Sequence, residues 1–282
     1  MKLRIFMLAF AAGFAVFMAF AGFMVLRYAE HGKNAVAEEP APSKPYLDVE
    51  YANFLLIFTD DGEAEAFALV GLDGKSNRIP VFGFSPKLTL ELRGNRVSAA
   101  ELFSATETEV FLGAAEKALS VPINGYFILD RNACETVLTK TGGFDYILPN
   151  EINYTDGNKK INLSAGNQSI NGKKFCDILF YDGFSEDERA NTLSRMVSLY
   201  FGSRLRRFSS DREKMYSLLC NYTVTDIDAY DNEELSGLVD FLANSRSVTA
   251  GHVKCETKAD EKSGLLLFTS STAERLASWF NE

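Results

Sequence analysis

An uncharged segment of 22 residues near the start of the chain most constrains how this protein can fold. Residues 5–26 contain no Asp, Glu, Lys or Arg. At about 1.5 Å per residue, a helix of that length spans the roughly 30 Å hydrocarbon core of a bilayer. Soluble domains seldom bury a helix that is apolar on every side. The sequence therefore predicts a transmembrane helix.

The charges beside this segment predict its orientation. Lys2 and Arg4 precede it, whereas Arg27 follows it with Glu30 close behind. By the positive-inside rule, the start of the chain lies in the cytoplasm and the rest lies outside. The alternative is a cleaved signal peptide with its site at residues 35–37, but a signal core is only about 7–15 residues long. We therefore expect a single-pass protein of the cell membrane.

On this interpretation the chain has three parts. Residues 1–27 are a cytoplasmic stub and the transmembrane helix, residues 28–46 are an extracytoplasmic tether, and residues 47–282 are a folded domain. The tether is rich in proline and poor in apolar residues, which is typical of an extended spacer. A domain of that length buries roughly 70–75% of its unfolded surface, so it can fold without disulfides or metals. The net charge of −9 argues against a nucleic-acid partner.

The pattern of the domain predicts strands mixed with helices. Residues 53–58 and 66–72 are continuous apolar runs, typical of strands buried on both faces. Ser185 precedes three acidic residues and a long amphipathic segment that extends to about Phe208, which predicts a capped helix. Because such elements alternate irregularly along the chain, we expect an α/β fold: a layered α-β-α domain with a central mixed sheet.

The cysteines leave two interpretations open. They are widely spaced and form no C-x-x-C pair, so a zinc site is not predicted: Cys134, Cys176, Cys220 and Cys255. Outside the cytoplasm they can form two disulfides, in any of three pairings. The alternative is that they are small buried hydrophobic residues, which the apolar periodicity around Cys134 and Cys176 favours.

Four segments follow one another in an order that carries a family resemblance. They are NFLLIFTDD at 53–61, RVSAAELFSA at 96–105, VPINGYFILDRNACETVLTKTGGFDYILP at 121–149 and LSAGNQSING at 163–172. Their order and spacing resemble the LytR-CpsA-Psr family, whose third segment reads V-P-I-D-Y-Y-V-x-V-D-F-x-G-F-x-x-L-V-D-x-L-G-G-V-x-V-x-V-P. The resemblance covers a core at about residues 51–208, and residues 209–282 follow as a C-terminal extension.

The resemblance implies a function in the cell envelope. Family members are membrane-anchored proteins of Gram-positive envelopes that move glycopolymers from an undecaprenyl-pyrophosphate carrier to peptidoglycan. For this chain, the resemblance implies a polyprenyl (pyro)phosphate lipid or lipid-linked glycan and peptidoglycan as partners. It also implies an apolar pocket between the sheet and its helices that holds the polyprenyl chain, consistent with the 23 phenylalanines.

The resemblance further implies a Mg²⁺ ion at the pyrophosphate. Asp60 stands where the family has its first metal-binding Asp, and Glu65 falls at the second acidic position. Two hard oxygen ligands suffice for Mg²⁺ if phosphates and water complete the coordination. The alternative is that both are solvated loop acids of an acidic protein.

The resemblance implies cationic residues that bind the pyrophosphate, and this chain has only some of them. Arg189 matches the first arginine of the R-x-x-R-Q motif, and Lys87 replaces the arginine of I-P-R-D-T. These two residues are the candidate catalytic and substrate-binding cations. The two arginines of the R-x-R motif are Phe180 and Asp182 here. The second arginine and the glutamine of R-x-x-R-Q are replaced as well, by Thr192 and Leu193.

These departures leave two functions open. Each charge-assisted hydrogen bond to phosphate contributes about 1.5–3 kcal/mol, so the losses weaken pyrophosphate binding by several kcal/mol. One possibility is a divergent phosphotransferase with weakened catalysis, in which Asp60 or Glu65 orients the metal or accepts a proton. The other is a non-catalytic module that binds a polyprenyl lipid or an envelope partner, and the missing arginines favour it.

Overall fold

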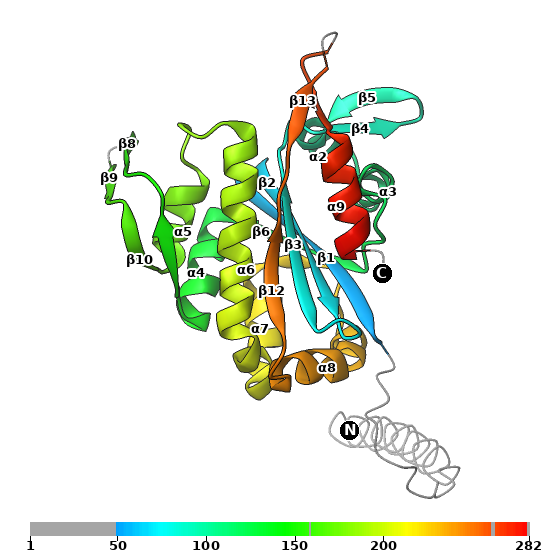
Figure 1. Cartoon of the computed structure of the whole chain (residues 1–282), viewed down its shortest axis with the longest axis vertical. Helices are drawn as coiled ribbons and strands as arrows, with labels where there is room; N and C mark the ends of the chain where they lie inside the picture. The colour runs from blue at the N-terminus through cyan, green and yellow to red at the C-terminus, as the bar shows by residue number, and fades with distance from the viewer. Residues whose placement is uncertain (1–48, 158, 261–262, 281–282) are drawn as a thin grey trace, which may run out of the picture. The chain divides into compact units, whose positions relative to one another are not determined.

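The computed structural model describes residues 49–157, 159–260 and 263–280. The expected transmembrane helix and tether both lie outside these residues. Within the described ranges, no helix combines the length and the apolar character needed to cross a bilayer. The described part has a central sheet between two layers of helices (Figure 1), which confirms the predicted layered α-β-α architecture.

The central sheet is mixed, as predicted. Its strands are β1 (Tyr51–Asp60), β2 (Glu63–Asp73), β3 (Arg78–Phe84), β6 (Gly125–Asp130), β11 (Val224–Thr225) and β12 (Thr249–Val253). They are arranged in the order β11-β6-β1-β2-β3-β12. β1 is parallel to β6 and β3 is parallel to β12, while the other neighbouring strands are antiparallel.

Strand β1 is apolar on both faces because the sheet has a core on each side. Phe54 and Phe58 belong to one buried cluster, and Leu55 and Ile57 belong to the other. Since successive side chains of a strand point to opposite faces, one continuous apolar run fills both cores. The prediction of a fully buried strand at residues 53–58 is therefore confirmed.

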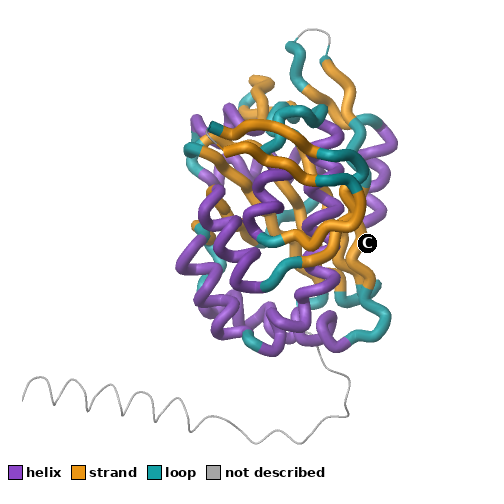
Figure 2. The backbone as a smooth tube through the Cα atoms, turned by 90° about the vertical axis from the view of Figure 1, so that its left-hand side faces the viewer, coloured by secondary structure: helices purple, strands orange, loops and turns teal. Residues whose placement is uncertain are grey.

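Helices cover both faces of the sheet. The described helices are α2 (Ala99–Ala105), α3 (Thr108–Leu119), α4 (Arg131–Thr141), α5 (Gly172–Leu179), α6 (Glu186–Ser210), α7 (Arg212–Tyr222), α8 (Ala229–Asn244) and α9 (Ser270–Phe280). Helices α2, α3 and α9 lie on one side of the sheet and α4 to α8 lie on the other (Figure 1). In the turned view of Figure 2, helices gather in the lower half of the domain.

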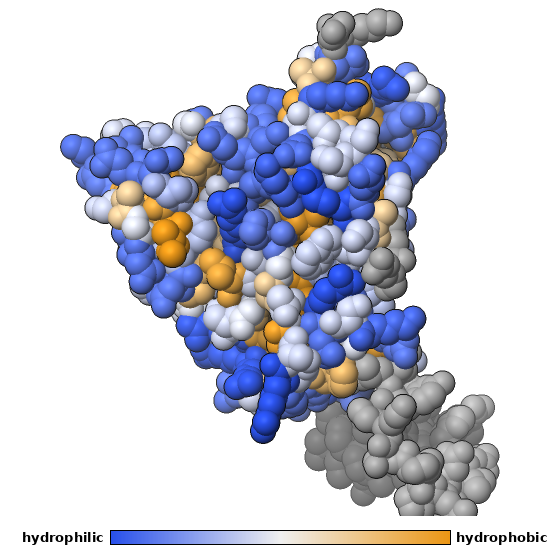
Figure 3. Space-filling view, viewed as in Figure 1, coloured by the Kyte–Doolittle hydropathy of each residue, from blue (hydrophilic) through white to orange (hydrophobic). Residues whose placement is uncertain are grey.

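Four two-stranded sheets complete the described domain. They pair β4 (Thr89–Leu92) with β5 (Asn95–Ser98), β7 (Phe144–Leu148) with β10 (Gly166–Ile170), β8 (Ile152–Asp156) with β9 (Lys159–Leu163), and β13 (Thr257–Ala259) with β14 (Leu266–Phe268). The outer surface seen in Figure 3 is largely hydrophilic, with apolar side chains scattered over it. The large apolar side chains are instead concentrated inside the domain.

Sequence periodicity missed several short strands. In the segment 96–105, helix α2 begins only at Ala99, because the residues just before it pair with β4 as strand β5. Ser98 instead caps the helix through a hydrogen bond from the Glu101 amide. Strand β12 was not predicted, because its alternation is weak and its partner β3 lies far back in the chain.

Helix α6 packs directly on strand β3. Its predicted cap is confirmed: Ser185 and Glu188 form a reciprocal capping box. Gly83 lets the helix approach, because a Cβ placed there would lie 2.3 Å from the Ala190 carbonyl oxygen. The Gly83 amide donates to Ser194 Oγ at 2.5 Å, so the helix also binds the strand through a buried hydrogen bond. This contact fixes α6 against the sheet.

We predict that Gly83→Ala lowers the free energy of unfolding by about 2–3 kcal/mol, since the added methyl overlaps the Ala190 carbonyl. Gly113→Ala is the matched control. It lies within α3 with no heavy atom near its would-be Cβ, so we expect a gain of about 0.5–1 kcal/mol. Denaturant titration of the full-length protein in detergent measures both. Equal effects would contradict close packing of α6 on β3.

Candidate functional site

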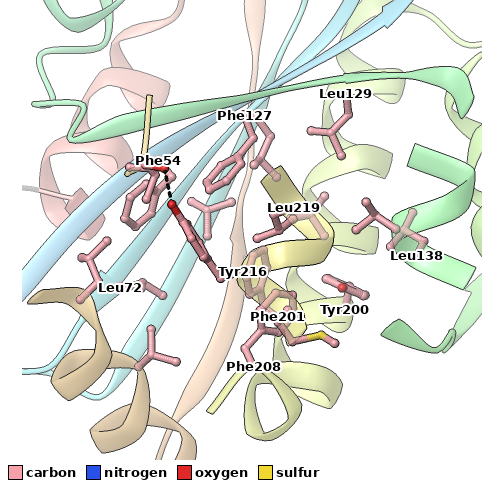
Figure 4. A pocket seen from close by; sticks show the side chains of 18 of the residues that line it. Phe54, Leu72, Phe127, Leu129, Leu138, Tyr200, Phe201, Phe208, Tyr216 and Leu219 are labelled. Carbon is pink, nitrogen blue, oxygen red and sulfur yellow. Dashed lines mark hydrogen bonds between the residues drawn. The ribbon is translucent and has the colours of Figure 1, made fainter. Parts of the chain in front are cut away.

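An apolar cavity of about 190 Å³ lies between the sheet and helices α4 to α8 (Figure 4). Phe54 and Leu72 line it from the sheet, and Tyr200, Phe208 and Leu219 line it from the helices. The cavity lies in the larger of the two buried clusters, where the sheet face and helices α4, α6 and α8 meet. This confirms the predicted apolar pocket between the sheet and its helices.

Few polar side chains line the cavity. Arg212 pairs with Asp240 at 2.8 Å, and the Tyr216 hydroxyl donates to the Ile227 carbonyl at 3.4 Å, while Arg212 Nε is buried without a hydrogen-bond partner. The interior therefore offers few polar groups to a ligand. A mostly apolar space of this kind suits an aliphatic chain.

A polar cluster lies where strands β1 and β6 end. The two strands are parallel, with Thr59 opposite Asp130, so the next residues, Asp60 and Arg131, emerge side by side. The Arg131 guanidinium forms a bidentate ion pair with Asp60, at 2.6 Å between Nη2 and Oδ2. Its Nη1 donates to Asp156 of β8 at 3.0 Å. Arg131 therefore joins the end of the sheet to the β8–β9 hairpin.

The same guanidinium lies on the ring of Phe180. The Arg131 Cζ is 4.5 Å from the ring centroid, a cation–π distance. Phe180 is 7% exposed and follows the last residue of α5. In the family segment quoted above, phenylalanine stands at position 131, and arginine stands at position 180 in the R-x-R motif. This chain has arginine at position 131 and phenylalanine at position 180, so the two residue types are exchanged between the two positions.

A second set of ion pairs lies beside this cluster. Lys87 Nζ is 2.8 Å from Glu186 of α6, and the Ser85 hydroxyl donates to the same carboxylate at 2.6 Å. Burial raises the pKa of Glu186, but the hydrogen bonds from Lys87 and Ser85 outweigh it and leave that pKa below its usual value. Lys87, Ser85 and Glu186 therefore form one hydrogen-bonded group.

Arg189 connects the two groups. It donates to the Leu179 carbonyl at the end of α5 at 3.2 Å, and its Nη2 is 3.8 Å from the exposed carboxylate of Asp182. Glu65 lies in the field of Arg189 and of the surrounding acids. Burial raises the pKa of Glu65, and the charges of neighbouring acids, Asp60 among them, raise it further against the opposing effect of Arg189.

The structure thus brings the four predicted site residues into one network. Asp60 pairs with Arg131, Lys87 with Glu186 and Arg189 with Asp182. The charges of these pairs act on Glu65, and that of Arg189 acts also on Glu186. Sequence reasoning missed Arg131 and Asp156. One signal for Arg131 was available: the family segment has phenylalanine at this position, directly after the end of a strand, and this chain has arginine. Leu193 is fully buried in the core, so its position has no access to the site.

Acids outnumber bases in this network. The cations are Lys87, Arg131 and Arg189, and the carboxylates are Asp60, Glu65, Asp156, Asp182 and Glu186. Each cation already has at least one carboxylate partner within 4 Å. A phosphate approaching the network therefore meets engaged cations and uncompensated negative charge.

The arrangement also bears on the expected Mg²⁺ ion. Both oxygens of Asp60 accept hydrogen bonds from Arg131. Among the described residues, no cluster of three or more acids, histidines or cysteines is placed to hold a metal. As arranged, these side chains do not fit a magnesium site, because the ion would first have to displace Arg131 from Asp60. The Mg²⁺ site that the resemblance implies at Asp60 and Glu65 would therefore form only once Arg131 has left Asp60.

Comparison with known proteins places the fold. No family model matches the sequence, and no curated protein matches it. Solved structures do match. A candidate transcription regulator from Eubacterium siraeum has a TM-score of 0.73 and 12% identity, over 86% of this chain and 98% of that one. TagV of B. subtilis has a TM-score of 0.66 and 14% identity, over 81% and 95%.

TagT bound to LIIa-WTA is similar too, with a TM-score of 0.63 and 12% identity, over 87% of this chain and 96% of that one. TagV and TagT are LytR-CpsA-Psr enzymes. At such low identity the likeness shows the fold alone. The described domain therefore has a LytR-CpsA-Psr-like fold.

We predict that wild-type protein binds Mg²⁺ weakly or not at all, and that Arg131→Met creates a measurable site by freeing Asp60. Methionine keeps an apolar chain against Phe180, so the local packing is retained. Isothermal titration of the full-length protein with MgCl₂ alone measures both. The double variant Arg131→Met with Asp60→Asn is the control and should lose the gain. Tight Mg²⁺ binding by the wild type would contradict the conclusion that the ion pair with Arg131 keeps Asp60 from binding the metal.

Proposed function

We propose that this protein is a membrane-anchored, LytR-CpsA-Psr-type protein of the cell envelope that binds the polyprenyl chain of a lipid-linked glycopolymer and has weakened or lost transferase activity. One observation carries the proposal: the lining of an apolar cavity includes Phe58 and Leu129, which lie two positions before residues of a polar network in which acids outnumber bases. The fold supports the class, and the residues of the network argue against efficient transfer. Residues 5–26 are the proposed membrane anchor, with the domain outside the cytoplasm.

The cavity and the polar network are parts of one site. Phe58 and Leu129 line the cavity, and they lie two positions before Asp60 and Arg131. An amphiphile whose chain fills the cavity would thus place its head group at the ends of β1 and β6. Burying apolar surface contributes about 25 cal/mol per Å², so a prenyl chain gains affinity from the cavity alone. Affinity for the lipid does not require a strong head-group site.

Catalysis of phosphoryl transfer needs more than the network offers. The charge that develops on the phosphate oxygens must be stabilised by donors fixed in place. Here Arg131 is held by Asp60 and Asp156, and Lys87 is held by Glu186. To bind a pyrophosphate, each cation must exchange a carboxylate partner for a phosphate. The net gain is therefore small, and exposed Asp182 adds repulsion.

A slow phosphotransferase is the second candidate, and Glu65 is the observation that favours it. The acceptor hydroxyl of peptidoglycan must lose a proton as it attacks the phosphorus next to the glycan. A base works best when its pKa is near the working pH. Burial raises the pKa of Glu65 toward that range, beside Arg189. In this scheme Arg131 and Arg189 orient the phosphates, and undecaprenyl phosphate leaves.

We predict that filling the cavity blocks lipid binding. Val239→Trp on α8 places a large ring in the lining and should weaken binding of undecaprenyl phosphate at least tenfold, about 1.4 kcal/mol. Val110→Trp is the matched control, because Val110 is 41% exposed on α3 across the sheet. Competition with a radiolabelled lipid in detergent measures the affinities of the full-length protein. If both variants bind as the wild type does, the cavity is not the lipid site.

We also predict that removing acids from the network strengthens pyrophosphate binding. Asp156→Asn with Asp182→Asn frees Arg131 and Arg189 from one partner each and should raise affinity for farnesyl pyrophosphate about tenfold at low salt. Glu274→Gln on α9 changes the charge of an exposed residue on the other side of the sheet and should have no effect. Calorimetric titration measures these affinities.

The same variants test the level of activity. With a lipid-pyrophosphate glycan and a peptidoglycan acceptor, the wild type should show little or no transfer. Turnover equal to that of TagT would refute the binding-protein proposal, and Arg189→Ala should then abolish it. No gain in pyrophosphate affinity for the double variant would show that the head group binds elsewhere.

A further inference from the structure

Two thiols lie together in the interior between helices α4 and α5. Cys134 of α4 and Cys176 of α5 are both 0% exposed and belong to the same buried cluster. The structure has all four cysteines as free thiols, and of these Cys220 is exposed and Cys255 is buried elsewhere. The Cys134 and Cys176 thiols are close enough to hydrogen-bond with each other. Cys134 also lines the apolar cavity, but the function proposed above uses the chemistry of neither thiol.

The two helices approach each other unusually closely at this place. A Cβ built on Gly172 of α5 would lie 2.0 Å from the carbonyl oxygen of Glu135 on α4, so only glycine fits there. One turn further along α5, the Cys176 thiol donates to the Arg131 carbonyl at 3.7 Å, one turn earlier on α4. The helices are therefore antiparallel and in backbone contact over this turn, and Cys134 lies within the α4 segment that Cys176 faces.

We propose that Cys134 and Cys176 form a disulfide that ties α4 to α5. A disulfide needs Cα atoms about 4.4–6.8 Å apart, and helices in backbone contact bring facing residues into that range. The bond forms by exchange with a disulfide oxidant such as oxidised glutathione. Both thiols lose their protons, the two sulfurs bond, and the two electrons and two protons reduce the oxidant to two thiols.

The position of the bond gives it a specific consequence. Arg131 is the first residue of α4, and Phe180 directly follows α5. A covalent link between these helices therefore holds together the two helix ends that carry the guanidinium and the ring. Burial raises the pKa of the Cys134 thiol, so exchange in the folded protein is slow, and the bond, once formed, resists reduction.

The test uses full-length protein in detergent, reduced and then equilibrated in glutathione buffers of increasing oxidised fraction. Remaining thiols are blocked with N-ethylmaleimide in denaturant, and peptides are mapped without reductant. We expect a Cys134–Cys176 linked peptide and a Cys255 thiol, while exposed Cys220 becomes mixed with glutathione. Oxidation should raise the Tm by roughly 5–10 °C, because the bond restrains the unfolded chain.

Variants distinguish this pairing from the others. Cys220→Ser should keep the linked peptide and the rise in Tm. Cys134→Ser should lose both and leave Cys176 as a thiol. Should Cys134→Ser fail to fold, the wild-type peptide map decides alone. The proposal is overturned if Cys134 and Cys176 remain thiols in a buffer that fully converts Cys220, or if either is found linked to another cysteine.

Discussion

The parallel pairing of β1 with β6 is the constraint on which the rest of this domain depends. It places β6 beside β1, a strand that is buried on both faces, and it sets the ends of the two strands level. One consequence is packing, because alternate residues of β1 fill two separate cores. The other consequence is chemical, because Asp60 and Arg131 leave the two strands next to each other. The contact between Asp60 and Arg131 is therefore a result of the strand register.

The bidentate ion pair between Arg131 and Asp60 stabilises the end of the sheet but disfavours the binding of an anionic ligand. It satisfies Asp60 and orients Arg131 over Phe180, so the end of the sheet is held together by charge and ring contacts. It also uses the charges that an anionic head group would need. Breaking a partly buried ion pair leaves both groups poorly solvated, which costs free energy before any new contact is made. A site stabilised in this way binds phosphate less readily than one with unpaired arginines.

Sequence patterns predicted strands that are buried on both faces and helices whose apolar residues recur with a regular period. Residues 53–58 and the capped helix after Ser185 are examples, because their apolar pattern reports directly on their surroundings. Short strands such as β11 and β12 gave no comparable signal, since they are held by pairing with distant residues. Likewise, the four candidate site residues could be named one by one from the family resemblance, but the Arg131–Asp60–Asp156 contacts could not be predicted. Such contacts depend on which strand ends adjoin, and a single sequence does not record that.

Strand β12 gives the domain a particular order of assembly. It is parallel to β3 and pairs Thr249 with Arg78, so the outer edge of the sheet is completed by residues near the end of the chain. Until those residues emerge during synthesis, β3 has an open row of backbone donors and acceptors in an apolar setting. Contacts so distant in sequence also slow folding, because a long loop must close first. Until β12 has paired, the exposed edge of β3 can pair wrongly with a strand of another chain. The edge of β3 is therefore the place where a folding chaperone would protect the nascent chain.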